Sequence, residues 1–217
     1  MRYCVLIILL VIHTGCNSNR NKLVNDKILS DLNAKYSEAK AFFGKDFVNH
    51  FPKNISKDNI TFNEGFSPEL GNLELILIDH LVNNSSTSII AEFKKKSIAI
   101  YEANDSCLLI VNRFATRDNY YNIELSAADK LMINNKCSSD HYPVPNFWHN
   151  DFTTEKTQCK LPSDFRLFVL EAKSGKYFDE DKLTDGRFMP RKWKNGYSKG
   201  VAISQVRNVI IYWLVIW

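Results

Sequence analysis

The sequence predicts an α+β fold: a single domain in which an N-terminal amphipathic helix packs on a largely antiparallel β-sheet. Three observations predict it: a helical repeat of apolar residues over residues 26–43, several short segments rich in β-branched and aromatic residues, and an apolar C-terminal run. The 217 residues are 45% apolar and 24% charged, with a mean hydropathy of -0.26. These values exclude a polytopic membrane protein and a mostly disordered chain.

The helix over residues 26–43 is predicted from the spacing of its apolar side chains. They recur every three or four positions, at Ile28, Leu32, Tyr36, Ala39 and Phe43. Asn25 can cap the start, and Gly44 suits the end. A helix lying on a membrane is the alternative, but its charges balance and form no basic face. The sequence therefore favours a helix that packs one face on a sheet.

Short apolar segments predict the strands of the sheet. The expected strands are residues 59–62, 73–78, 96–103, 107–114, 165–171, 201–204 and 209–217. The turn-forming residues 104–106 and 205–208 each predict a hairpin between their neighbours. Residues 87–95 predict a short helix. The last segment is too short for a transmembrane helix and does not alternate as barrel strands do, so it predicts a strand buried on both faces.

The first 16 residues have the three parts of a secretory signal. Arg2 supplies the positive charge, residues 3–12 are an apolar run too short to span a bilayer, and small or polar residues follow. The end of this segment, Thr14-Gly15-Cys16, resembles the lipobox of bacterial lipoproteins, with a histidine where the family usually has an aliphatic residue. A plain secretory signal and a buried N-terminal strand are the alternatives.

In the lipoprotein family, signal peptidase II cuts before the cysteine, whose sulfur receives a lipid. The resemblance implies that residues 1–15 are a signal peptide, Cys16 carries an acyl anchor, residues 16–24 are a short tether, and residues 25–217 are the domain. Two or three acyl chains, such as palmitate, hold a protein stably at a membrane. The tether lacks the acidic run found in some surface-displayed lipoproteins. This favours a periplasm-facing outer-membrane lipoprotein over one on the cell surface.

Three cysteines remain in the predicted domain, and an exported compartment permits disulfides. Cys137 and Cys159 lie in residues 134–162, an irregular stretch with three prolines that is long for a loop. A bridge between these two would close a loop of about 22 residues and stabilise the fold by roughly 3 kcal/mol. We predict this pair. Cys107 begins an apolar segment and is predicted to be a buried free thiol.

The sequence offers no specific sign of a metal or catalytic site. Cys137, His141, His149 and Cys159 are the residue types that bind zinc, but they lack the close pairs of tetrahedral sites. No G-x-S-x-G, S-x-x-K or H-E-x-x-H motif occurs. We therefore assign no catalytic residue, metal or cofactor. An envelope hydrolase acting on glycan or peptide remains the alternative function.

The charge distribution near the C-terminus predicts an interaction surface. Residues 186–217 hold six basic residues and no acid, whereas residues 171–185 hold five acids and three lysines. Arg, Trp and Tyr commonly anchor interfaces. The candidate partner-binding residues are Arg187, Arg191, Lys192, Trp193, Lys194 and Tyr197. Such a surface suits an acidic protein, an anionic glycan or lipid headgroups. In the alternative, the basic stretch folds back on the acidic one and Trp193 belongs to the core.

The predicted function follows from the anchor and from the absence of a catalytic motif. A formal net charge of +4 is too small to predict nucleic-acid binding. The sequence favours a non-catalytic envelope lipoprotein that contacts the membrane through its N-terminal lipid and binds a partner. One version is an immunity protein that neutralises a toxin in the periplasm; a structural component of envelope assembly is a further alternative.

Overall fold

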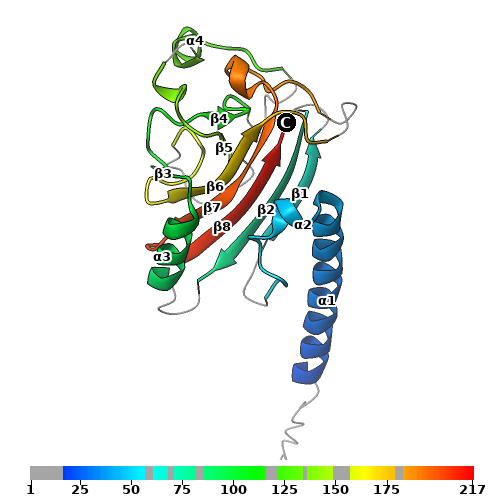
Figure 1. Cartoon of the computed structure of the whole chain (residues 1–217). Helices are drawn as coiled ribbons and strands as arrows, with labels where there is room; N and C mark the ends of the chain where they lie inside the picture. Colours follow the sequence, from blue (N-terminus) through cyan, green and yellow to red (C-terminus); the bar gives the residue numbers. More distant parts are fainter. Residues whose placement is uncertain are drawn as a thin grey trace, which may run out of the picture.

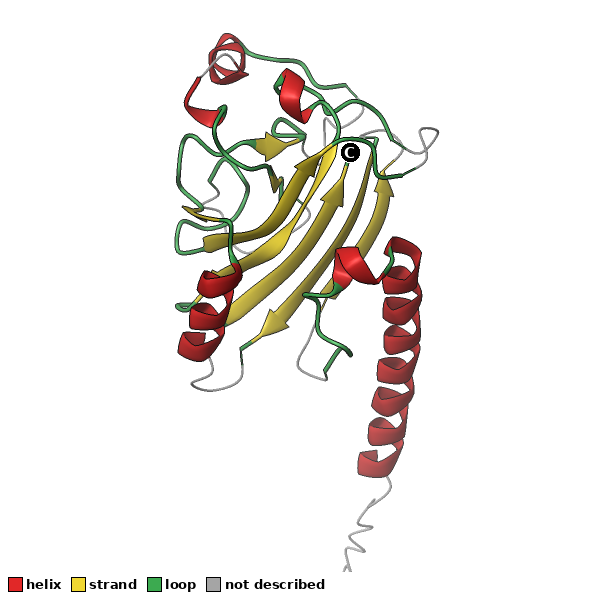
Figure 2. Cartoon of the chain, in the orientation of Figure 1, coloured by secondary structure: helices red, strands yellow, loops and turns green. Residues whose placement is uncertain are grey.

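The structure, a computed structural model, describes residues 17–56, 61–67, 71–81, 86–115, 122–133, 136–148, 157–178 and 183–217. It confirms the α+β fold: an antiparallel sheet carries helices on one face and a loop-rich layer on the other (Figure 1, Figure 2). Among the described residues, no helix combines the length and apolar character needed to cross a bilayer.

The main sheet has six strands in the order β1-β2-β8-β7-β6-β3, and every neighbouring pair is antiparallel. Its strands are β1 (Thr61–Ser67), β2 (Asn72–His80), β3 (Ala99–Glu102), β6 (Arg166–Ser174), β7 (Gly196–Ser204) and β8 (Val209–Ile216). A short parallel pair lies in the loop layer, formed by β4 (Ile110–Val111) and β5 (Val144–Pro145). The helices are α1 (Asn17–Phe43), α2 (Lys45–Val48), α3 (Ser86–Lys96) and α4 (Ala127–Ile133), with 3-10 turns η1 (Lys136–Ser138) and η2 (Arg191–Trp193).

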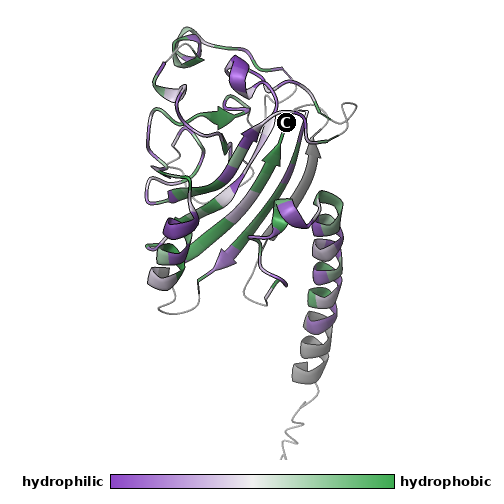
Figure 3. Ribbon diagram, viewed as in Figure 1, coloured by the Kyte–Doolittle hydropathy of each residue, from purple (hydrophilic) through white to green (hydrophobic). Residues whose placement is uncertain are grey.

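Both faces of the sheet are buried at its centre. Leu75 of β2 and Leu214 of β8 pack with α1 and α2, whereas Ile76 and Trp213 point to the other side and pack under the loop layer. Figure 3 shows hydrophobic residues concentrated along these central strands. The prediction that the C-terminal run is a strand buried on both faces is therefore confirmed.

Helix α1 ends where the sequence predicted, but it begins nine residues earlier, at Asn17. Gly44 follows it with φ 84°, the left-handed conformation that glycine adopts easily. Tyr36 and Ala39 are buried against the sheet, whereas Ile28 is 51% exposed. Residues 17–25 are mostly polar and carry no apolar repeat, so the sequence pattern gave no sign of this first part of the helix.

Of the two predicted hairpins, one is confirmed and one is wrong. Strands β7 and β8 pair from Ser204 and Val209 around the predicted turn. By contrast, β3 pairs with β6, and residues 107–114 contribute only the two residues of β4, which pair with β5. The apolar side chains of residues 108–111 belong to the core under the loop layer, which explains why they resemble a sheet strand in sequence. The short helix predicted at residues 87–95 is confirmed as α3.

The disulfide joins Cys107 to Cys137, so the predicted pairing of Cys137 with Cys159 is wrong, as is the free thiol at Cys107. Cys159 is instead a free thiol, fully buried in the core, where its sulfur lies 3.6 Å from the carbonyl oxygen of Ala103. Burial raises the pKa of the Cys159 thiol. The hydroxyl oxygen of Thr157 also lies 3.3 Å from this sulfur. The irregular sequence around Cys159 gave no sign of its burial.

A buried lysine of the sheet holds α2 in place. Lys199 of β7 is 6% exposed; its ammonium donates to the carbonyl of Asp46 at 2.6 Å and pairs with Glu171 at 2.8 Å. Burial alone would raise the pKa of Glu171, but hydrogen bonds from Lys173 and Lys199 outweigh it and bring that pKa to about 2. The ammonium of Lys199 thus links β7 to β6 through the ion pair and to α2 through the hydrogen bond.

His50, which follows α2, is expected to make the stability of the fold depend on pH. Its Nε2–H donates to the carbonyl of Trp213 at 2.9 Å, and burial lowers its pKa to about 3. The folded pKa lies below the ordinary value near 6.5, so stability is complete above about pH 6.5 and falls as the pH drops toward 3. We expect the free energy of unfolding, measured with urea, to be about 2 kcal/mol lower at pH 5.0 than at pH 7.0.

His50→Gln should remove most of that pH dependence. The exposed His80 supplies the control, because His80→Gln should leave the dependence unchanged. The comparison is made no lower than pH 5, because Glu171 has a depressed pKa and loses its contribution to the free energy of unfolding only below that pH. An equal pH slope in the His50→Gln variant and in the wild type would contradict the assignment.

Candidate functional site

Two of the predicted partner-binding residues lie in the core, so their assignment to a binding surface is wrong. Trp193 is 2% exposed, and its carbonyl accepts a hydrogen bond from the indole of Trp217 at 2.8 Å. Tyr197 is 4% exposed and packs edge-to-face on Phe47. Both aromatic side chains fill space between elements, so neither can anchor a partner on the surface.

Within the part of the chain that the structure describes, Lys194, Lys199 and Arg207 each contact an acidic side chain. Lys194 contacts Asp185 at 2.7 Å, Lys199 contacts Glu171, and Arg207 contacts Asp164 at 3.0 Å. For Lys194 and Lys199 the partners belong to the acidic stretch of residues 171–185. The alternative prediction, that the basic stretch folds back on the acidic one, is therefore confirmed for these two lysines.

Three other basic residues of this stretch, Arg187, Arg191 and Lys192, lie at or beside a hollow at one end of the molecule. Arg187 lines it, and Arg191 and Lys192 are exposed in the neighbouring turn η2. The hollow has about 330 Å³ of space, including solvent at its mouth. We call it the basic–aromatic pocket, and its lining consists of Leu109, Ile110, Arg113, Phe114, Met132, Ile133, Ser138, Arg187, Phe188 and Pro190. The described lining contains two guanidinium groups, two aromatic rings and no carboxylate.

Phe188 is held beside this pocket in an unfavourable backbone conformation. Met189 N–H donates to the carbonyl of Gly186 at 3.3 Å, which closes a four-residue turn with Phe188 in its third position at φ 62°. Glycine or asparagine normally takes a positive φ there, because a larger side chain costs roughly 1–2 kcal/mol. The ring is 40% exposed and lies 5.5 Å from that of Phe114, edge to face.

Arg113 also lines the pocket. Its guanidinium donates to the carbonyl of Leu108, and burial lowers its pKa from the usual value. Its Nε–H is buried and meets no acceptor among the described residues. A guanidinium stays charged at neutral pH, so the pocket presents a positive charge within an apolar surround.

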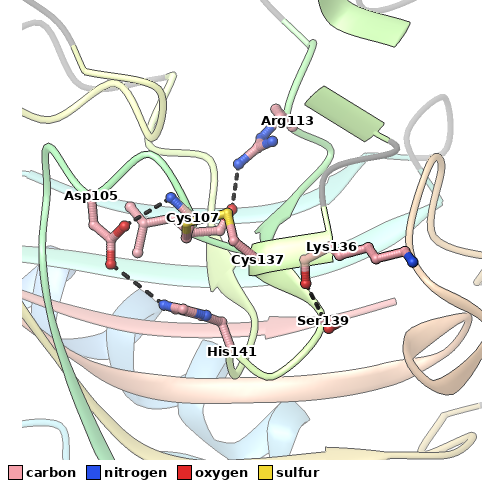
Figure 4. Close-up of a disulfide and its surroundings, with 8 residues drawn as sticks. Asp105, Cys107, Arg113, Lys136, Cys137, Ser139 and His141 are labelled. Atoms are coloured by element: carbon pink, nitrogen blue, oxygen red, sulfur yellow. Dashed lines mark hydrogen bonds and ion pairs between the residues drawn. A yellow bond between two sulfur atoms is a disulfide. The ribbon is translucent and has the colours of Figure 1, made fainter. Parts of the chain in front are cut away.

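The disulfide fastens two walls of the pocket to each other. Cys107 precedes the wall formed by residues 109–114, and Cys137 lies beside Ser138 on the opposite wall. Figure 4 shows the bond with Arg113 on one side and Asp105 and His141 on the other. Asp105 accepts the N–H of Cys107 at 2.8 Å and lies 3.4 Å from His141.

Of the four residues considered for zinc, the three that the structure describes do not come together as a site. Cys137 is bonded to Cys107, Cys159 is buried, and His141 faces Asp105 and stacks on Tyr101. In the part of the chain that the structure describes, no three His, Cys, Asp or Glu residues form a metal-binding group. The predicted anchor Cys16, and also His149, lie outside the described residues.

Comparisons with known proteins do not assign the chain to a group: no family model, curated protein or solved structure matches it. The basic–aromatic pocket therefore depends on the physical argument alone. Sequence reasoning identified Arg187, Arg191 and Lys192 through their charge. It missed Phe188, which is an isolated apolar residue in an irregular segment, and also Phe114 and the α4 residues, because the sequence gave no sign that these segments meet.

Proposed function

We propose that the protein is a lipid-anchored envelope lipoprotein whose folded domain is non-catalytic and binds a protein partner through the basic–aromatic pocket. The observation that carries the proposal is the turn of residues 186–189. Phe188 adopts a strained conformation and yet leaves 40% of its surface exposed. A bulky residue kept at such a position indicates a functional constraint, since glycine or asparagine would relieve the strain.

The lining of the pocket suggests what the partner presents. Aromatic and arginine side chains dominate the binding energy of protein interfaces. The pocket combines Phe114 and Phe188 with Arg113 and Arg187, and Arg191 and Lys192 stand beside it. An acidic protein surface with an apolar side chain at its centre matches this arrangement in charge and polarity. A toxin neutralised in the periplasm by an immunity protein is one such partner.

The position of the pocket is compatible with an anchor at Cys16. Helix α1 begins at Asn17, at one end of the molecule, whereas α4 and η2 lie at the opposite end (Figure 1). A lipid on the residue before α1 would therefore leave the basic–aromatic pocket directed away from the membrane. This placement favours a soluble partner over lipid headgroups.

Phe188→Asn tests the binding surface. Asparagine tolerates the left-handed conformation, so relief of strain should offset the lost ring contact, and the free energy of unfolding should change by less than about 1 kcal/mol. Affinity for a partner captured from envelope extracts with the full chain should fall at least 30-fold, the loss typical of a central interface residue. Isothermal titration with the purified partner measures it.

Phe42→Ala is the matched control, because Phe42 is an exposed aromatic residue on α1 that does not line the pocket. It should retain full affinity. Equal affinities of the wild type and the Phe188→Asn variant would refute the proposed surface, as would a binding constant that does not change with salt.

The anchor is tested separately by metabolic labelling. We expect a clickable palmitate analogue to label the wild-type chain and not the Cys16→Ala variant, because the thioether-linked lipid needs this sulfur. Cys159→Ala should label like the wild type. Labelling that persists without Cys16 would place the lipid elsewhere and remove the membrane part of the proposal.

A further inference from the structure

A second hollow lies between the sheet and the loop layer and shares no lining residue with the basic–aromatic pocket. We call it the amide hollow; it is lined by Asn72, Glu74, Val111, Asn112, Pro145, Asn146, Trp148 and Val215 and has about 210 Å³ of space, including solvent at its mouth. Three of these side chains are amides and one is a carboxylate. We infer that this hollow is a calcium-binding site.

The four oxygen-bearing side chains are neighbours in space. Asn72 and Glu74 lie two residues apart on β2 and so point to the same face of the sheet. The amide nitrogen of Asn112 donates to Oδ1 of Asn72 at 3.1 Å. The amide nitrogen of Asn146 in turn donates to the carbonyl of Asn112 at 2.8 Å. Three separate segments thus bring these four side chains to the lining of one hollow.

The orientation of the Asn146 amide is fixed by its surroundings. Its nitrogen donates to the carbonyls of Asn112, Arg113 and Ala115, at 2.8, 3.3 and 2.9 Å. Three acceptors on one side require the nitrogen there, so Oδ1 occupies the other side. That oxygen is buried and receives no hydrogen bond from the described residues, and the same holds for Oδ1 of Asn112. A buried acceptor without a donor costs about 1–3 kcal/mol and calls for a ligand that would offset the cost.

The chemistry of the lining selects the ligand. Calcium takes six to eight ligands and prefers carboxylate and amide oxygens, and it tolerates irregular geometry. Magnesium demands a smaller, near-octahedral shell, and the described lining has no thiolate or imidazole for zinc. Glu74, only 6% exposed, is the one carboxylate of the described lining. A single carboxylate predicts weak binding, with a dissociation constant on the order of 0.1–1 mM, as in extracellular calcium modules.

Thermal unfolding of the full chain in mild detergent tests the site. We expect 10 mM Ca²⁺ to raise the Tm by about 3 °C and a chelator to reverse the shift. Glu74→Gln preserves shape and removes the charge, so it should abolish the shift. Glu102→Gln, which changes an exposed carboxylate on β3, should retain it. An equal shift from Mg²⁺, or a shift that survives in Glu74→Gln, would overturn the assignment.

A second measurement remains decisive if Glu74→Gln does not fold. Terbium replaces calcium at oxygen sites, and Trp148 in the lining should sensitise its luminescence. We expect Trp148→Phe to reduce the sensitised emission at least fivefold, while the Ca²⁺-induced Tm shift persists. If terbium gives no tryptophan-sensitised emission with the wild-type chain, or if Ca²⁺ does not displace it, the hollow is not a calcium site.

Discussion

Replacing Gly200 with alanine is expected to lower the free energy of unfolding by about 3 kcal/mol or more. Gly200 of β7 lies opposite Trp213 of β8. An added methyl group would stand 2.2 Å from the carbonyl oxygen of Phe168 and 2.5 Å from the Trp213 ring. Because the first obstacle is backbone of the neighbouring strand and the second is a fully buried indole, neither can move away without disturbing the sheet.

Urea denaturation measures this loss, and Gly44→Ala is its control. Gly44 has a φ of 84° and no atom within 4 Å of an added methyl group, so alanine there adds conformational strain alone, about 1 kcal/mol. The difference between the two variants isolates the collision at Gly200. A Gly200→Ala variant as stable as Gly44→Ala would show that β7 and β8 are packed less closely than the structure has them.

Removing the disulfide is expected to have an effect of similar size. Cys107 and Cys137 are 30 residues apart in sequence, so the bond restricts a long loop of the unfolded chain. The double variant Cys107→Ser/Cys137→Ser should lose about 3.5 kcal/mol of stability in urea denaturation. It should also bind a partner of the basic–aromatic pocket more weakly, because two walls of the pocket are no longer fastened.

Cysteine connectivity is checked by peptide mapping of the non-reduced chain. We expect one linked peptide pair that contains Cys107 and Cys137, with Cys159 alkylated only after unfolding. Cys159→Ala serves as the control, since it keeps the bond and should lose less stability than the double variant. A linked peptide that contains Cys159 would disprove the connectivity.

The elements predicted correctly are those that a local pattern defines. The β7–β8 hairpin has two apolar segments and a short polar turn, so register and pairing partner follow from adjacent residues. The end of α1 is marked by Phe43 and Gly44, and α3 by a short amphipathic repeat. In each case the information lies within about fifteen residues of the element.

The features that were missed depend on residues far apart in the chain. Cys107 begins an apolar segment and Cys159 lies in an irregular one, yet Cys159 is the buried thiol, and only the placement of η1 brings Cys137 to Cys107. Trp193 and Tyr197 stand among charged residues and are buried by contacts with Trp217 and Phe47. The positive φ of Phe188 results from the surrounding tertiary structure, because the sequence of its turn contains no glycine or asparagine at that position.

Helix α1 makes the N-terminal segment of the described chain a rigid rod. Its 27 residues form a rod of about 40 Å, and Leu29 packs on the core after about 18 Å of helix. The sequence predicted a short tether here, over residues 16–24. A continuous helix instead works as a spacer of constant length. If the preceding cysteine carries the proposed lipid, α1 holds the domain at a set height and inclination above the membrane. The domain then meets a partner only within a layer of defined distance from the membrane surface.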